Sequence, residues 1–227
     1  MPELVTYQLE GAIAWITMDD GKVNALSLDM LTQINAALDR ASADGAIVVL
    51  RGRDGLFSAG FDLRTLRAGG PDARAMLRAG FDLATRLLSF PTPVTIACTG
   101  HTIAMAVFLL MCGDYRVGAA GPYRITANEV AIGLTMPLAA IEICRHRLTP
   151  AHFGRAMALA EVYSPDNAVE AGFLDRVVPA TSLEEAARET ATALAQLDMA
   201  AFGATKLRVR GQALSAVQAA IDAEFPA

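Results

Sequence analysis

The apolar positions along the first 45 residues recur with two different periods, and each period predicts one kind of secondary structure. Residues 4–9 and 12–18 are short β-prone runs separated by Glu10-Gly11, which predicts a β-hairpin. Ser27 then precedes apolar residues spaced three or four apart as far as about Ala41. That spacing predicts an amphipathic helix with Ser27 as its N-cap.

Uniformly apolar runs appear farther along the chain. Residues 46–50 and 94–98 are short, and the first is rich in β-branched side chains, as expected of strands buried on both faces. Between them, amphipathic stretches at 63–68 and 73–88 predict two helices broken by Gly69-Gly70-Pro71. Residues 103–112 predict a buried helix, and a further short strand is expected at 115–117.

After Pro137 the pattern becomes almost wholly helical, and only FLDRVV at 173–178 interrupts it. The predicted helices there are 138–147, 151–161, 165–171, 182–197 and 213–223. Buried strands that alternate with helices are typical of an α/β fold with layered sheets. We therefore expect a single domain over 1–227, with an α/β core to about 135 and a helical C-terminal lobe over about 136–227.

Composition narrows the classes of function. The chain has 227 residues, 53% of them hydrophobic, and a formal net charge of −5. It offers no basic surface for nucleic acid or an anionic membrane. The most apolar segment, 103–112, is too short for a bilayer, which needs about 20 residues, and no signal peptide is visible. An odd number of cysteines in apolar contexts, Cys98, Cys112 and Cys144, favours reduced thiols in a cytoplasmic protein.

Several common catalytic motifs are missing. The sequence has no GxSxG, GxxxxGK[ST], CxxC or HExxH pattern, and no GxGxxG follows a predicted strand. The three histidines are far apart and have no nearby carboxylate or cysteine pattern. We therefore expect no metal and no tightly bound cofactor.

One carboxylate stands in an apolar run. Glu129 lies within TANEVAIGLTMP, residues 126–137. A buried carboxylate must find a partner, stay protonated or act as a proton carrier, because an unpaired charge in an apolar site is costly. Arg124 is close in sequence and could be that partner.

Two glycine turns carry the other candidate chemistry. SAGFDL at 58–63 and TGHTIAM at 99–105 each join a predicted buried strand to a predicted helix. Peptide N–H groups at such junctions lack intrahelical partners. Two of them that converge form an oxyanion hole, although ordinary tight turns have the same sequence appearance.

Five segments together resemble the crotonase family, the enoyl-CoA hydratases and isomerases. The resemblance runs from about residue 4 to 208. In chain order the segments are DDGKVNALS (19–27), LFSAGFDL (56–63), CTGHTIAMAVFLLMCGDYRVGA (98–119), ANEVAIGLTMP (127–137) and SPDNAVEAGFLDRVV (164–178). It implies crotonase-like layered β-sheets built of ββα units, followed by a helical C-terminal lobe that is shorter here than in most members.

The resemblance also implies roles for particular residues. The two oxyanion N–H groups fall on Phe61 and Met105, and Glu129 matches one of the two glutamates that act in family hydratases. The other glutamate is replaced by Phe108. A lone carboxylate can move one proton within the substrate, which converts a 3-enoyl-CoA to a 2-enoyl-CoA. It suits that reaction better than the addition of water. The family's usual run of glycines around the second donor is replaced by Ile103-Ala104-Met105-Ala106.

Further positions match segments that line coenzyme A, which enters here as part of the substrate. These are Lys22, Val23, Ala25, Ser58, Ala59, Gly60, Asp62 and Leu63. Asp114 resembles a structural aspartate that caps backbone N–H groups. Lys206 lies where family members place a lysine toward the CoA phosphates, although a solvated basic face with Arg208 and Arg210 explains it equally well.

The resemblance implies an acyl-CoA enzyme of fatty-acid metabolism that is a lyase or an isomerase. We expect isomerisation or weak hydration, with an acyl-CoA thioester as the ligand and a homotrimer or dimer of trimers as the assembly. Three alternatives stay open: an efficient 2-enoyl-CoA hydratase, a thioester hydrolase or decarboxylase that recruits Asp62, and a non-catalytic CoA-binding scaffold.

Overall fold

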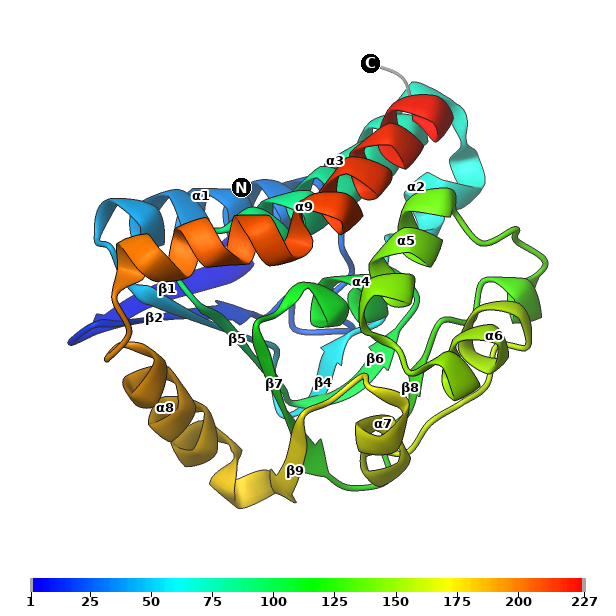
Figure 1. The fold of residues 1–227 in the computed structure, drawn as a ribbon. Helices are drawn as coiled ribbons and strands as arrows, with labels where there is room; N and C mark the ends of the chain where they lie inside the picture. The colour runs from blue at the N-terminus through cyan, green and yellow to red at the C-terminus, as the bar shows by residue number, and fades with distance from the viewer. Residues whose placement is uncertain (1, 226–227) are drawn as a thin grey trace.

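A computed structural model describes residues 2–225 and contains two β-sheets (Figure 1). The larger sheet has the strand order β1-β2-β3-β5-β7-β9; β1 and β2 are antiparallel, and every other neighbouring pair is parallel. Its strands are β1 (Val5–Glu10), β2 (Ile13–Met18), β3 (Ile47–Arg51), β5 (Val94–Cys98), β7 (Tyr115–Ala120) and β9 (Arg176–Pro179). The predicted hairpin and the buried strands are therefore confirmed.

The smaller sheet is parallel, and although layered sheets were expected, none of its three strands was predicted from the sequence. Its strands are β4 (Gly55–Ser58), β6 (Gly100–Ile103) and β8 (Ile125–Thr126), in that order. The strands come in consecutive pairs, so that β3, β5 and β7 enter the large sheet and β4, β6 and β8 enter the small one. A helix follows each pair, which confirms the ββα units.

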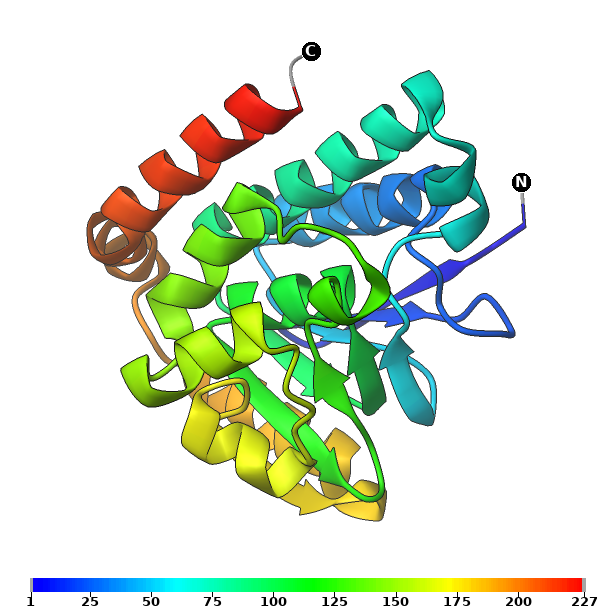
Figure 2. The same ribbon diagram turned by 90° about the vertical axis from the view of Figure 1, so that its right-hand side faces the viewer.

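Helices cover both faces of the large sheet. The helices of the described chain are α1 (Leu28–Ala43), α2 (Leu63–Ala68), α3 (Gly70–Ser89), α4 (Met105–Cys112), α5 (Leu138–Arg147), α6 (Pro150–Ala158), α7 (Pro165–Ala171), α8 (Leu183–Leu194) and α9 (Met199–Glu224), with short 3₁₀ turns at Val130–Ile132 and Ala180–Ser182. Figure 1 shows α1, α3 and α9 on one side of the sheet and α8 on the other. Figure 2 shows α5, α6 and α7 along one side of the small sheet.

Alternate side chains of the large sheet pack into two cores. Val48 and Leu50 belong to the main core, while Ile47 and Val49 pack toward α8. This follows from the two-residue repeat of a strand, which sends successive side chains to opposite faces. A strand covered on both faces needs apolar residues throughout, which explains why 46–50 reads as a continuous apolar run.

Some predicted boundaries were wrong. Helix α9 begins at Met199 instead of about residue 213, because its first half carries charged residues that obscure the apolar pattern. The interruption of the helical pattern at 173–178 contains the start of strand β9 (Arg176–Pro179), and Phe173 and Leu174 are core residues before it. Cys98, Cys112 and Cys144 are buried free thiols. None of the helices in the described part of the chain has the length and apolar character needed to cross a membrane.

Candidate active site

The three predicted catalytic groups follow the three strands of the small sheet. Ser58 of β4 pairs with Thr102 of β6, and Ile103 of β6 pairs with Thr126 of β8. Phe61, Met105 and Glu129 come two or three residues after these strand ends. Because parallel strands end at the same edge of a sheet, the three groups gather at one carboxyl edge, where ligands of parallel sheets commonly bind.

The two glycine turns are in direct contact at this edge. Gly60 has a φ of +87°, and a Cβ atom placed on it would lie 2.9 Å from the Ile103 carbonyl oxygen and 3.3 Å from the Met105 nitrogen. Only glycine fits this close approach without displacing the neighbouring backbone. The second turn differs from the prediction in one respect, because Gly100 is the first residue of strand β6, which precedes helix α4.

Both candidate donor N–H groups are free. Within residues 2–225, neither the Phe61 N–H nor the Met105 N–H donates a hydrogen bond. Met105 is the first residue of α4, where a backbone N–H has no intrahelical acceptor. The preceding residue, Ala104, has φ +52° and ψ −128°, a conformation that costs a non-glycine residue strain. Its N–H donates to the Thr126 carbonyl oxygen at 2.9 Å, which fixes this turn to the strand that leads to Glu129.

Substitution of Gly60 tests whether the contact between the turns matters. We expect Gly60→Ala to lower kcat/KM by about 10²-fold, since a displacement of about 1 Å at a reacting group has that effect. Gly11→Ala is the matched control, because Gly11 has a φ of +59° with no atom within 4 Å of an added Cβ. Both variants should lose about 1–2 kcal/mol of stability through backbone strain. Equal activities in the two variants would contradict this account of the site.

Glu129 is buried without an ion-pair partner. Its residue surface is 7% exposed, and its Oε2 atom has no hydrogen-bond partner in the described chain. The alternative prediction of an ion pair with Arg124 was wrong, because no salt bridge among residues 2–225 involves Glu129 and Arg124 is exposed. Burial raises the pKa of Glu129 to about 7. A carboxyl group with a pKa near neutrality can both take up and return a proton.

The position of a second carboxylate is filled by an aromatic ring. Phe108 is 1% exposed and lies one turn along α4 from Met105. Its ring stacks on Phe81 of α3 with 6.3 Å between centroids.

The carboxylate of Asp62 is engaged in capping helix α2. It accepts hydrogen bonds from the Thr65 N–H at 2.8 Å and from the Thr65 hydroxyl at 3.0 Å. The backbone hydrogen bond from Thr65 lowers the pKa of Asp62.

The two segments predicted to line coenzyme A lie against each other. The Ala59 N–H donates to the Val23 carbonyl oxygen at 3.0 Å, and the Leu26 N–H donates to the Gly60 carbonyl oxygen at 2.8 Å. Lys22, Val23 and Leu63 are exposed, and Ala25, Ala59 and Asp62 are partly exposed.

Ser58 departs from its predicted place in the CoA lining. It is fully buried, and its hydroxyl donates to the Asn24 carbonyl oxygen at 2.6 Å while accepting from the Gly60 N–H at 3.1 Å. Ser58 therefore holds the loop in its conformation and does not line the predicted CoA-binding surface.

Asn24 was missed by the sequence prediction. It is buried with a φ of +49°, and its side-chain amide donates to the carbonyl oxygens of Met18 and Phe57. The residue type could have indicated this role, because asparagine adopts a positive φ more readily than most residues.

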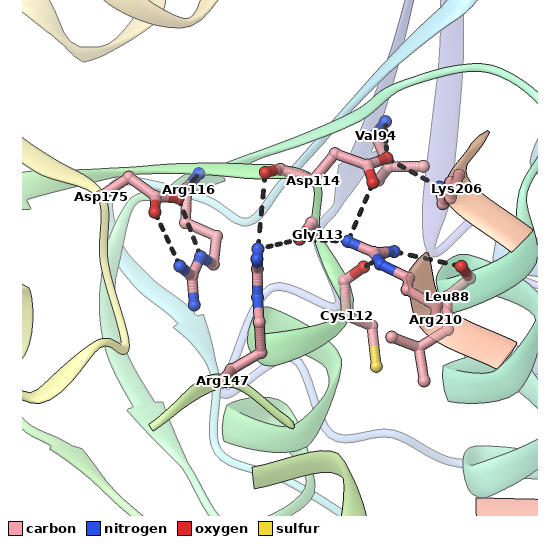
Figure 3. Close-up of polar contacts among 10 residues, drawn as sticks. All are labelled: Leu88, Val94, Cys112, Gly113, Asp114, Arg116, Arg147, Asp175, Lys206 and Arg210. Carbon is pink, nitrogen blue, oxygen red and sulfur yellow. Dashed lines mark hydrogen bonds and ion pairs between the residues drawn. The ribbon is translucent and has the colours of Figure 1, made fainter. Parts of the chain in front are cut away.

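Lys206 cannot reach a CoA phosphate. Its side chain is 3% exposed, and its Nζ atom lies 2.7 Å from Asp114 Oδ2. Figure 3 shows Arg210 on the same carboxylate, 2.9 Å from Oδ1. Both sequence readings of Lys206, CoA ligand and solvated basic face, were therefore wrong. The structural role of Asp114 is confirmed, because it also accepts from the Val94 N–H at 2.8 Å.

The remaining features add no second site. No cluster of His, Cys, Asp and Glu suited to a metal ion occurs among the described residues. Two surface hollows of about 310 and 460 Å³ border strand β1, against α8 and α1 respectively, and neither is lined by Phe61, Met105 or Glu129.

Comparison with known proteins places the chain in a family. Residues 8–226 match the enoyl-CoA hydratase/isomerase family model. The mouse mitochondrial enoyl-CoA delta isomerase 1 is 30% identical over 194 residues, which are 83% of this chain and 67% of the isomerase. A crystal structure of a probable enoyl-CoA hydratase from Mycobacterium tuberculosis has a TM-score of 0.94 at 49% identity, covering 97% of this chain and 94% of that one.

A second structure of the same mycobacterial protein describes it as an enoyl-CoA isomerase, with a TM-score of 0.95, 48% identity and coverage of 99% and 100%. The relatives therefore carry both names, hydratase and isomerase. The fold, the order of the motifs and these matches agree, and the chain belongs to the enoyl-CoA hydratase/isomerase family.

Proposed function

We propose that the protein isomerises 3-enoyl-CoA to 2-enoyl-CoA, with Glu129 as the single proton shuttle. The observation that carries the proposal is that Glu129 is buried and unpaired while a phenyl ring fills the place of the family's second glutamate. Water addition needs a group to position and deprotonate the water as well as a proton donor. Moving a double bond needs only one proton to leave and return.

The steps balance on one carboxylate. The thioester oxygen accepts hydrogen bonds from the Phe61 and Met105 N–H groups, which stabilise the negative charge that develops on it. The Glu129 carboxylate removes a proton from C2, and the C2–H electron pair becomes part of an enolate conjugated with the C3–C4 double bond. The Glu129 carboxyl then delivers the same proton to C4 as the double bond forms between C2 and C3. Coenzyme A stays attached throughout, held by the 22–26 and 58–63 loops.

The proposed assembly is a homotrimer or a dimer of trimers. Several apolar side chains after Pro137 are exposed on the single chain, which supports an interface on this part of the molecule. They are Leu138, Leu159, Val169, Leu207 and Val209. Light scattering of the purified protein should give a mass of three or six chains, and a monomeric mass would contradict this assembly.

Purified protein assayed on both substrates tests the reaction. We expect 3-enoyl-CoA to be converted to 2-enoyl-CoA, and hydration of 2-enoyl-CoA to be at least about 10²-fold slower. Hydration at ordinary enzyme rates that is abolished by Glu129→Gln would refute the isomerase proposal. Release of free CoA would point to hydrolysis, and acyl-CoA binding without any turnover would point to a scaffold.

A further inference from the structure

The segment between β2 and α1 is closed by a carboxylate that the proposed mechanism does not use. Asp20 Oδ1 accepts hydrogen bonds from the Lys22 N–H at 2.7 Å and the Asn24 N–H at 2.8 Å. Asp20 Oδ2 accepts from the Ala25 N–H at 3.0 Å. In return, the Asn24 side-chain oxygen accepts from the Asp20 N–H at 3.0 Å. Residues 20–25 are therefore held in one conformation by hydrogen bonds to a single side chain.

Both carboxylate oxygens of Asp20 are needed for this closure. An amide in the same place offers one acceptor oxygen and one NH₂ group, which can only donate. At least one of the three backbone N–H groups would then face a donor. Although burial acts to raise it, the hydrogen bonds from these N–H groups and the charge of Arg53 hold the pKa of Asp20 below its ordinary value. Asp20 is therefore ionised at neutral pH, with both oxygens engaged.

The closed segment leads directly to the first oxyanion donor. Leu26 follows it and forms an isolated parallel bridge with Phe61. The Leu26 N–H donates to the Gly60 carbonyl oxygen at 2.8 Å. Three residues earlier, the Val23 carbonyl oxygen accepts from the Ala59 N–H at 3.0 Å. The turn that carries the Phe61 N–H is thus attached to the closed segment at two points.

The bond from Leu26 sets the direction of the donor itself. The Gly60 carbonyl and the Phe61 N–H belong to one planar trans peptide unit, in which C=O and N–H point in opposite directions. A hydrogen bond that fixes this carbonyl oxygen therefore also fixes the N–H. Met105, the other donor, is set by a different contact, between the Ala104 N–H and strand β8.

We propose that Asp20 is a positioning residue that aims the Phe61 N–H at the thioester oxygen. It closes residues 20–25 and so holds the Leu26 N–H against the Gly60 carbonyl oxygen. This inference rests on the proposed function, because that function gives the Phe61 N–H its role as an oxyanion donor. Asp20 acts through the backbone and carries no proton in the reaction.

The kinetics of Asp20→Asn test this role. We expect kcat for 3-enoyl-CoA to fall at least about tenfold, a part of the roughly 10²–10³-fold that one whole oxyanion donor contributes. Affinity for the substrate should fall less, because the charge on the oxygen develops mainly in the transition state. Rates are referred to the folded protein, measured by circular dichroism, so that a loss of stability alone leaves kcat unchanged.

Asp19→Asn is the matched control. It removes the same charge from the neighbouring residue, which is exposed. Asp19 accepts one hydrogen bond, from the Gly21 N–H to Oδ1 at 2.8 Å, and an asparagine oxygen can still accept it. The control should therefore keep the wild-type kcat.

Infrared spectroscopy of a bound thioester tests the same inference without turnover. Butanoyl-CoA labelled with ¹³C at the thioester carbonyl has no double bond to move, and hydrogen bonds to its oxygen lower the stretching frequency of the carbonyl. We expect the wild type and Asp19→Asn to lower this frequency equally on binding. Asp20→Asn should lower it less, because its Phe61 N–H is no longer held in line.

The outcomes separate this inference from the proposed function. An Asp20→Asn variant with the wild-type kcat and the wild-type carbonyl shift would overturn the inference. A wild type that shifts the carbonyl but turns over no 3-enoyl-CoA would refute the isomerase function alone, and the infrared comparison would still decide the role of Asp20. A wild type that binds butanoyl-CoA without any shift would overturn both. Asp20→Ser, which keeps a single acceptor oxygen, replaces Asp20→Asn in these measurements if the asparagine variant does not fold.

Discussion

Replacement of Glu129 by glutamine should lower kcat/KM for 3-enoyl-CoA by about 10²–10⁴-fold, the range that a positioned acid or base contributes. Glutamine keeps the size of the side chain but can neither accept the C2 proton nor return it. Binding should change little, because the thioester oxygen is held by backbone N–H groups. Glu142→Gln is the control, because Glu142 lies on α5 and its carboxylate already pairs with Arg145. A Glu129→Gln variant with more than a tenth of the wild-type activity would show that another group moves the proton.

The same variant should be more stable than the wild type above pH 7. Burial raises the folded-state pKa of Glu129 from 4.5 to about 7, so the folded protein binds the proton more tightly than the unfolded chain does. This proton binding stabilises the fold fully below about pH 4.5, and the stabilisation is lost as the pH rises through 7.

Well above pH 7 the buried charge therefore costs roughly 3 kcal/mol. Glutamine carries no such charge, so urea unfolding should show the variant gaining stability relative to the wild type between pH 5 and pH 8. A constant difference across that range would indicate an ordinary pKa for Glu129. Wild-type kcat/KM should rise with pH through about 7, since only the ionised carboxylate can remove the C2 proton.

Removal of the Asp114 carboxylate should destabilise the protein by about 3–5 kcal/mol, the usual cost of breaking a buried ion pair. Lys206 and Arg210, with side chains 3% and 6% exposed, would lose their only carboxylate partner within the described chain (Figure 3). Burial already lowers the pKa of Lys206 to about 8, and the charge of Asp114 opposes that shift. Without Asp114 the lysine should lose its proton at a lower pH.

Equilibrium unfolding of Asp114→Ala in urea measures this effect. Asp39→Ala is the control, because Asp39 pairs with Arg86 but its side chain is 73% exposed. Such surface pairs contribute at most about 1 kcal/mol. A loss below 1 kcal/mol in Asp114→Ala would mean that the cluster is held by its bonds to backbone carbonyls. Those bonds include Arg210 to the Leu88 oxygen at 3.1 Å and Arg147 to the Gly113 oxygen at 2.6 Å.

The large sheet and most helices could be predicted because their apolar patterns are strong and local. The small sheet could not, since β4, β6 and β8 read GLFS, GHTI and IT, which contain glycine and polar residues. Their pairing partners lie dozens of residues away, and only the tertiary fold supplies them. Both glycine turns were identified from the sequence, but the strand that begins at Gly100 and precedes α4 was not.

Long-range partners also explain what was missed at the site. Glu129 could be singled out because its neighbours in sequence are apolar, whereas its lack of a partner is visible only in the fold. Lys206 was expected on the surface, as most lysines are, and its counter-charge lies 92 residues away. The ring of Phe81 packs against those of Phe61, Phe108 and Phe225, which come from three other parts of the chain, and no local pattern reveals these contacts.

The most direct test of a single shuttling carboxylate is to follow the proton itself. A 3-enoyl-CoA deuterated at C2 is converted in ordinary water, and the isotope at C4 of the 2-enoyl-CoA product is measured by mass spectrometry or NMR. Glu129 is only 7% exposed, so its proton should return to the substrate faster than it exchanges with solvent. We expect a substantial fraction of the product to carry deuterium at C4. Product with solvent hydrogen alone at C4 would contradict a single shuttle and point to a second acid.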